Sequence, residues 1–130
     1  MNWEENLVLA RGLAGQPFEV TERAAVSLAY YGVFNLARRW LEANVTPIEN
    51  RGAHQQVWQT FKRAERAGDE SRVEWKLIGR LGDSLRQLRN QVDYDDHVEE
   101  LQSRTLRALS TAERMLQLLA ELEVFNRRRR

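Results

Sequence analysis

The sequence has 130 residues, 42% of them apolar, which is enough for one hydrophobic core in a single domain. The formal net charge is +1, but the four arginines at 127–130 contribute +4, so residues 1–126 carry −3. This balance excludes a protein that binds nucleic acid through overall charge, because such a protein needs a basic face on its body. We expect one domain over residues 1–126, followed by a basic C-terminal tail at 127–130.

The chain contains no cysteine, which excludes disulfide bonds, thiol nucleophiles and cysteine-based zinc sites. No apolar run approaches the roughly 20 residues that span a membrane, and no signal peptide opens the sequence. We therefore expect a soluble, cytoplasmic protein that does not associate with a membrane.

Helical patterns begin at the N-terminus. Asn2 and Glu5 can cap a short first helix, which Gly15 and Pro17 would end. Residues 18–43 follow and are apolar on most sides, so we expect this segment to be the central helix of the fold.

The third and fourth helices are predicted from capping signals. Residues 46–49 have the form of a capping box with proline at the first helical position, although Asn50 could cap the third helix instead. Residues 67–69 should end this helix and cap the fourth. The fourth helix contains Gly79 and Gly82, and a glycine inside a helix costs about 1 kcal/mol relative to alanine. Both glycines therefore indicate close packing or a kink.

The joint between the fourth and fifth helices holds polar residues that solvent exposure does not explain. The apolar residues that lead into it recur at spacings of three and four: Leu77, Ile78, Leu81, Leu85, Leu88 and Val92. Arg89 falls roughly 20° past the edge of this face, so we expect a half-buried guanidinium. Residues 96–99 form a capping box and predict a last helix that runs from about 97 to 125. We expect Arg89, Tyr94 and His97 to meet at this joint.

These segments predict an all-α fold, an antiparallel up-and-down bundle of four long helices plus a short N-terminal helix. In such a bundle the apolar faces of neighbouring helices share one core. The sequence shows no repeat, no glycine-rich phosphate loop and no low-complexity segment apart from the tail.

Two motifs in the chain resemble the HEPN superfamily of small α-helical nucleotide-binding and ribonuclease domains. The first is Arg89-Asn90 followed by Tyr94, which stands where the family motif usually has histidine. The second, Tyr30 to Phe34, is similar to a signature of the family's second helix. The resemblance covers about residues 20–120 and looks like a subgroup of short HEPN proteins with tyrosine in the motif. It implies that the helical bundle is HEPN-like.

The HEPN resemblance also implies an activity and partners. Ribonucleases of this superfamily cut RNA without a metal ion, by attack of a 2′-hydroxyl on the adjacent phosphate, so we expect no metal and no cofactor. Their homodimers bring two copies of the motif face to face. The resemblance implies an endoribonuclease toxin of a bacterial toxin–antitoxin or defence system, whose partner is a nucleotidyltransferase antitoxin. In some HEPN toxins this partner silences the protein by adding adenylate to a tyrosine near the motif, and Tyr94 is the candidate here.

The candidate catalytic residues are Arg89, Asn90, Tyr94 and His97. Arg89 suits the stabilisation of phosphate charge, because a guanidinium is permanently charged and can donate two hydrogen bonds, and Asn90 could orient it. A tyrosine hydroxyl has a pKa of about 10 in water and is rarely a base at neutral pH, so a histidine would have to supply acid–base catalysis. His97 is nearer to the motif in sequence and His54 is the less exposed, and we favour His97.

Three further residues are candidates for binding the substrate: Tyr31, Asn35 and His54. Asn35 stands at a position where the family often has histidine, and a buried amide needs hydrogen-bond partners. Asn35 therefore either ties two helices together or faces Arg89. Related short HEPN proteins often have a histidine where His54 stands, at the start of the third helix. Alternatively, His54 is a histidine of the core whose hydrogen bonds are satisfied.

Other interpretations explain some of the same residues. Arg89 could form an ion pair with Asp93, one turn away, that only holds the joint together. Asp93 and His97 could bind a divalent metal with neighbouring acids, although a helix cap and solvated acids explain them more simply. The chain could also be a catalytically inactive HEPN module that binds a nucleotide, RNA or a protein partner.

Overall fold

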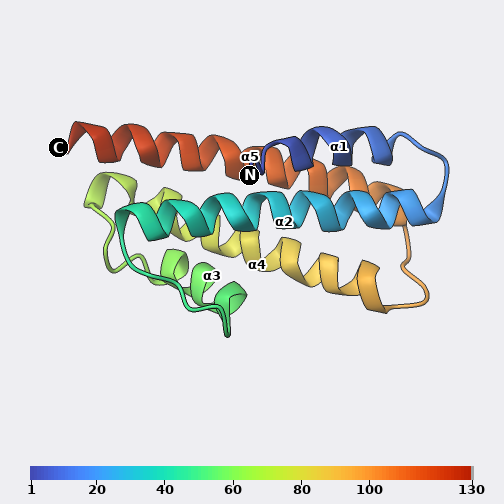
Figure 1. The fold of residues 1–130 in the computed structure, drawn as a ribbon, viewed down its shortest axis with the longest axis horizontal. Helices are drawn as coiled ribbons and strands as arrows, with labels where there is room; N and C mark the ends of the chain where they lie inside the picture. The colour runs from blue at the N-terminus through green and yellow to red at the C-terminus, as the bar shows by residue number, and fades with distance from the viewer. Residues whose placement is uncertain (130) are drawn as a thin grey trace.

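The computed structural model describes residues 1–129, and its regular structure is helical throughout that range (Figure 1). The elements are α1 (Glu5–Ala14), α2 (Glu19–Asn44), α3 (Ala53–Arg63), the short 3₁₀ helix η1 (Asp69–Ser71), α4 (Arg72–Tyr94) and α5 (Leu101–Arg128). The all-α prediction is confirmed. The bundle has three long helices rather than four, however, because α3 has only 11 residues.

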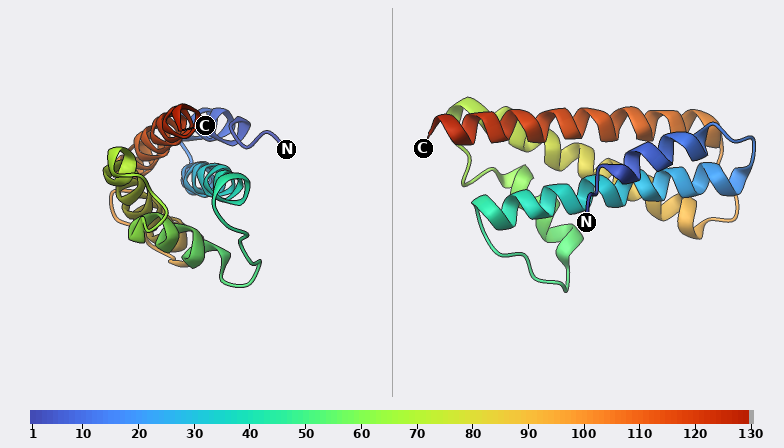
Figure 2. Two further views of the ribbon diagram at one scale, coloured as in Figure 1. Left: turned by 90° about the vertical axis from the view of Figure 1, so that its left-hand side faces the viewer. Right: turned by 45° about the horizontal axis from the view of Figure 1, so that its top comes forward.

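The three long helices α2, α4 and α5 run along the length of the molecule and reverse direction from one to the next (Figure 1). The end-on view in Figure 2 shows them around a common centre, with α1 doubled back along α2. The short helix α3 packs mainly against α4 and also contacts α2. The predicted antiparallel up-and-down arrangement is therefore confirmed. Over the described residues, no helix is both long and apolar enough to cross a membrane.

The central position of α2 is also confirmed. Its buried residues point in several directions around the helix: Ala25, Val26, Ala29, Tyr30, Gly32, Val33, Phe34, Ala37 and Leu41. Gly32 faces α1, where a Cβ atom would lie only 3.0 Å from the carbonyl oxygen of Trp3. This small residue lets α1 lie close against α2.

The buried face of α4 includes the two glycines that the sequence analysis singled out. Cβ atoms at Gly79 and Gly82 would overlap backbone and side-chain atoms of α3, and at Gly82 the obstacle is the indole of Trp58. The glycines therefore mark close packing. Because both glycines belong to the buried face of α4, the centre of this face lies near Arg89, which is only 8% exposed. The expectation of a half-buried Arg89 was wrong.

The predicted capping boxes were wrong, because no side chain caps the start of α3 or α5. α3 begins after Gly52 and α5 after Glu100, and both residues have left-handed backbone angles, with φ of 73° and 52°. The segment before α5 is held in place by hydrogen bonds from another helix. Arg23 of α2 donates hydrogen bonds to the carbonyl oxygens of Val92, Asp95 and Asp96, at 2.6 to 3.0 Å. The loop that joins α4 to α5 is thus fixed by tertiary contacts.

The basic C-terminal segment starts inside the last helix. α5 continues to Arg128, and Arg127 lies 3.4 Å from Glu123, one turn earlier. Arg130, the last residue of the predicted tail, lies outside the described residues.

The variant Gly82→Ala tests the packing of α3 on α4. Because the added methyl group would overlap the fully buried Trp58 ring, we expect unfolding free energy to fall by about 1–3 kcal/mol, as in other overpacked cores. Chemical denaturation measures this change. The matched control is Gly12→Ala in α1, where a Cβ meets nothing within 4 Å and alanine should add about 0.5–1 kcal/mol. Equal effects of the two variants would contradict the close packing.

Candidate functional site

Arg89 lies against two neighbouring tyrosine rings of α2. Its guanidinium carbon is 5.3 Å from the centroid of the Tyr30 ring and 5.2 Å from that of the Tyr31 ring. Both distances are in the range of cation–π attraction, which is worth about 0.5–2 kcal/mol and is strongest where water is excluded. Tyr30 is fully buried and Tyr31 is 37% exposed, so the site lies at the edge of the core.

The hydrogen bonds of Arg89 are incomplete. Its Nη1 donates to Asp93 Oδ2 at 3.4 Å, and Ser27 Oγ of α2 donates to the other carboxylate oxygen of Asp93 at 2.5 Å. The ion pair weighed in the sequence analysis is therefore present, although it is long. The Nε atom of Arg89 is buried without a partner among residues 1–129. Its Nη2 also makes no hydrogen bond there but is not buried, so this edge of the guanidinium is open.

Arg86, one turn before Arg89, adds a second cation to the site. Its Nε is likewise buried without a hydrogen-bond partner in the described chain. Arg86 and Arg89 are both close enough to His54 and Tyr30 to affect their pKa values. Two guanidinium groups thus lie near one aromatic cluster, and within residues 1–129 the one carboxylate bonded to them is Asp93. The site is therefore locally positive.

A chain of hydrogen bonds leads from the core to the surface of this cluster. Trp58 Nε1 donates to Tyr30 Oη at 3.0 Å, and Tyr30 Oη lies 2.6 Å from His54 Nδ1. If Tyr30 Oη also accepted from His54 Nδ1–H, its own buried hydrogen would have no acceptor among the described residues. The hydroxyl hydrogen of Tyr30 therefore donates to His54 Nδ1. The imidazole also stacks on Phe34, with ring centroids 3.9 Å apart. These contacts fix both the position and the orientation of His54.

Burial and neighbouring charges keep the side chains of this hydrogen-bond series uncharged. Burial, together with the positive charges of Arg86, Arg89 and Arg38, lowers the pKa of His54 to about 4. Burial also raises the pKa of Tyr30 to about 12, although the hydrogen bond from Trp58 and the two arginines of α4 oppose this rise. At neutral pH His54 is therefore uncharged, and Tyr30 keeps its proton.

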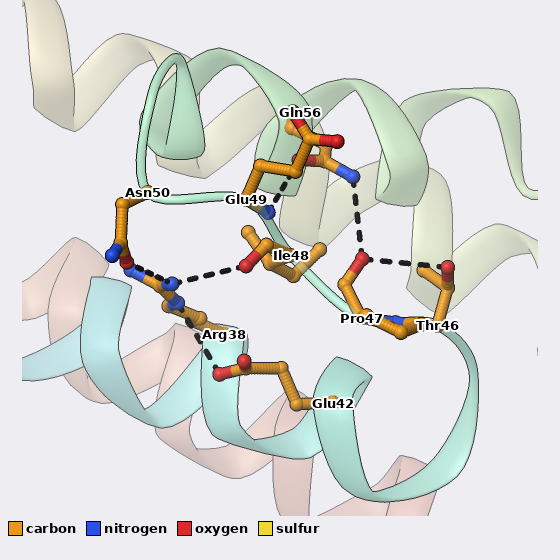
Figure 3. A network of polar contacts seen from close by, with 8 residues as sticks. All are labelled: Arg38, Glu42, Thr46, Pro47, Ile48, Glu49, Asn50 and Gln56. Atoms are coloured by element: carbon orange, nitrogen blue, oxygen red, sulfur yellow. Dashed lines mark hydrogen bonds and ion pairs between the residues drawn. The ribbon is translucent and has the colours of Figure 1, made fainter.

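A polar network in the loop between α2 and α3 holds the start of α3, and with it His54, in place (Figure 3). Arg38 of α2 donates to the carbonyl oxygen of Ile48 at 3.1 Å and to Asn50 Oδ1 at 2.8 Å. Gln56 of α3 accepts a hydrogen bond from the backbone N–H of Glu49 at 3.1 Å. The loop is therefore tied to the helix on either side of it.

The structure brings together three of the predicted site residues, Arg89, Tyr31 and His54. Asn35 is partly buried and donates to the carbonyl oxygen of Tyr31 at 2.8 Å, within its own helix. That bond neither ties two helices together nor reaches Arg89.

The other predicted catalytic residues point away from this cluster. Asn90 and Tyr94 lie about 100° and 140° around α4 from Arg89, and both are exposed, Tyr94 by 76%. His97 is exposed in the loop that joins α4 to α5. Within one chain, the expected meeting of Arg89, Tyr94 and His97 does not occur, because α4 continues to Tyr94 and turns that side chain outward.

Sequence reasoning missed the residues that connect His54 to Arg89. Tyr30 was singled out only as part of the signature from Tyr30 to Phe34, and no functional role was predicted for Trp58. The one available signal was the position of Arg86, three residues before Arg89 and hence on the same helical face. No group of three or more histidine or acidic side chains within residues 1–129 is arranged to hold a metal ion.

Comparison with models of known protein families, with curated proteins and with solved structures finds no match for this chain.

The low pKa of His54 predicts a pH-dependent stability. Between the ordinary value of 6.5 and the folded value of about 4, the unfolded state binds more protons than the folded state. Stability should be complete above about pH 6.5 and fall toward pH 4, with a slope from this group of up to about 1.4 kcal/mol per pH unit.

Denaturant unfolding at several pH values measures this slope, and His54→Gln should remove the part that His54 contributes. The control is His97→Gln, which removes an exposed histidine and should retain the part that His54 contributes. If His54→Gln and the wild type lose stability in parallel, the buried and neutral state of His54 is contradicted.

Proposed function

We propose that this chain is an HEPN-type RNA-binding protein whose phosphate-binding site is formed by Arg86, Arg89 and His54. The observation that carries the proposal is the buried guanidinium of Arg89, which has one long ion pair and an unpartnered Nε. A buried charge is expensive unless it is fully paired. Groups that are buried and only partly satisfied are typical of sites where an incoming ligand completes the bonding.

The chemistry of the cluster suits a phosphodiester. Arginine forms two parallel hydrogen bonds with phosphate oxygens and keeps its charge at every physiological pH. Tyr31 adds an aromatic ring that is 37% exposed beside these cations. Proteins that bind single-stranded RNA combine backbone contacts from cations with bases stacked on aromatic side chains. Because the net charge of residues 1–126 is −3, binding should depend on this local site.

The activity we propose is metal-independent cleavage of RNA by a homodimer, as a toxin of a toxin–antitoxin or defence system. Cleavage needs a group that moves protons near the phosphate. The exposed His97 and Tyr94 lie outside the Arg89 cluster of their own chain. A dimer whose α4–α5 loops face each other could place the His97 side chain of one protomer beside Arg89 of the other. Dimerisation is thus part of the proposed mechanism.

A specific observation favours a second candidate, an inactive HEPN module that binds RNA, a nucleotide or a protein partner. The histidine that does lie in the cluster, His54, has its Nδ1 bonded to Tyr30. Because Nδ1 accepts the hydrogen of Tyr30, the proton of the neutral ring lies on Nε2. His54 therefore has no free lone pair with which to accept a proton from the 2′-hydroxyl. A single chain holds phosphate-binding groups without a base, and such a site binds RNA but cuts it poorly.

Substitution of the two arginines tests the proposal. We expect Arg86→Gln and Arg89→Gln each to weaken binding of a fluorescent single-stranded RNA about tenfold or more, because each removes charge-assisted hydrogen bonds to phosphate. Fluorescence anisotropy at one fixed salt concentration measures the affinity. Arg107→Gln, which removes the same charge from an exposed position on α5, is the matched control and should bind nearly as tightly as the wild type.

Since Arg89 is buried, its variant also needs a thermal melt to show that it is folded. Arg86 is partly exposed, so its variant keeps the test valid if Arg89→Gln unfolds. Equal binding by the wild type and both α4 variants, or no binding at all, would remove the proposed function.

Tyr94 carries a separate part of the proposal, modification by a nucleotidyltransferase antitoxin. Its side chain is 76% exposed at the end of α4, where an enzyme can reach the hydroxyl. Co-expression with a partner nucleotidyltransferase should add the mass of an adenylate, and Tyr94→Phe should abolish this addition while Tyr31→Phe retains it. Intact-mass spectrometry provides the measurement. An unmodified wild-type chain beside an active nucleotidyltransferase would contradict this role of Tyr94.

A further inference from the structure

We propose that His54 binds a phosphate oxygen of the RNA as a neutral hydrogen-bond donor through Nε2–H, in a tautomer that the Trp58–Tyr30 hydrogen-bond chain imposes. This inference rests on the proposed function and assigns a positioning role to Tyr30. The role of His54 is then recognition of the ligand, and not the acid–base catalysis for which histidine is usually chosen.

The direction of the hydrogen bonds determines the tautomer. Trp58 Nε1–H is a donor only, and Tyr30 Oη has one hydrogen to donate. That hydrogen goes to His54 Nδ1, 2.6 Å away, so Nδ1 is the acceptor. In a neutral imidazole the proton must then lie on Nε2. Trp58 and Tyr30 are both fully buried, so water does not compete for these bonds.

The Nε2 atom of His54 is the open end of this chain. It has no hydrogen-bond partner within residues 1–129, and it is not among the buried unpartnered atoms. It therefore reaches solvent. The cations whose charge acts on the ring are Arg38 on α2, which is paired with Glu42, and Arg86 and Arg89 on α4. A free N–H group in this positive field is suited to an anionic oxygen.

The remaining neighbours of His54 keep the ring in this state. On α2 it contacts the rings of Tyr30, Tyr31 and Phe34, which supply no carboxylate to attract a second proton. The acidic group of the cluster, Asp93, is bonded to Arg89 and Ser27. We therefore expect RNA binding that does not require protonation of His54 between about pH 6 and pH 8.

Long-range ¹⁵N–¹H correlation spectra of the free protein test the tautomer directly. The expected result is a neutral His54 ring with its proton on Nε2, and the proton should redistribute between the two nitrogens in Tyr30→Phe. A proton on Nδ1 of the wild type would overturn the inference. A merely structural role of Tyr30 would change stability without moving this proton.

Binding of a fluorescent single-stranded RNA tests the ligand contact. His54→Gln places an amide N–H close to the position of Nε2, so we expect it to bind within about threefold of the wild type, whereas His54→Ala should lose about tenfold. Gln117→Ala, at an exposed position on α5, is the control and should bind like the wild type. His54 is the residue at the solvent-facing end of the hydrogen-bond series, so both substitutions leave the Trp58–Tyr30 bond in place.

The outcomes separate this inference from the proposed function. If the wild type binds RNA and His54→Ala binds equally well, the role of His54 fails and the arginine site remains. If His54-dependent binding tightens sharply as the pH falls, the ring acts as a cation and the neutral-donor inference is overturned. If the wild type binds no RNA while the Nε2–H tautomer is observed, the RNA-binding function fails, and the ligand role of His54 fails with it.

Discussion

The hydroxyl group of Tyr30 is the point on which the arrangement of the site depends. Tyr30 is fully buried in the central helix, and a buried hydroxyl must have hydrogen-bond partners. It finds them on α3, in Trp58 and His54, while its ring faces Arg89 on α4. One side chain thus connects three helices. Trp58 can reach it because Gly82 leaves room for the indole against α4.

The same packing explains why Arg89 is a candidate for function. Tyr30 and Tyr31 cover the guanidinium, but aromatic faces replace only part of the hydration that a buried cation loses. Asp93 supplies one long ion pair. A core built only for stability would place an apolar side chain here, since apolar replacements of buried charges are often neutral or stabilising. An anionic ligand would complete the bonding that the protein leaves open.

Periodicity in the sequence was sufficient to predict the helical fold and the central place of α2, but not the exact faces or ends of the helices. The predicted face of α4 omitted Gly79 and Gly82, since glycines have no side chain to count as apolar, and this omission placed Arg89 at the edge. The starts of α3 and α5 were misplaced because contacts from Arg38 and Arg23, distant in sequence, hold the preceding loops. The bond between Tyr30 and His54 spans 24 residues and leaves no periodic signal.

The most direct test of the account is the NMR spectrum of arginine Nε–H groups during titration with a short single-stranded RNA. The Nε atoms of Arg86 and Arg89 are buried, so their protons should exchange slowly with water and be visible, unlike those of exposed arginines. We expect these two signals to move together on addition of RNA, because the ligand binds their guanidinium groups. Shifts confined to the exposed arginines, with Arg86 and Arg89 unchanged, would contradict it.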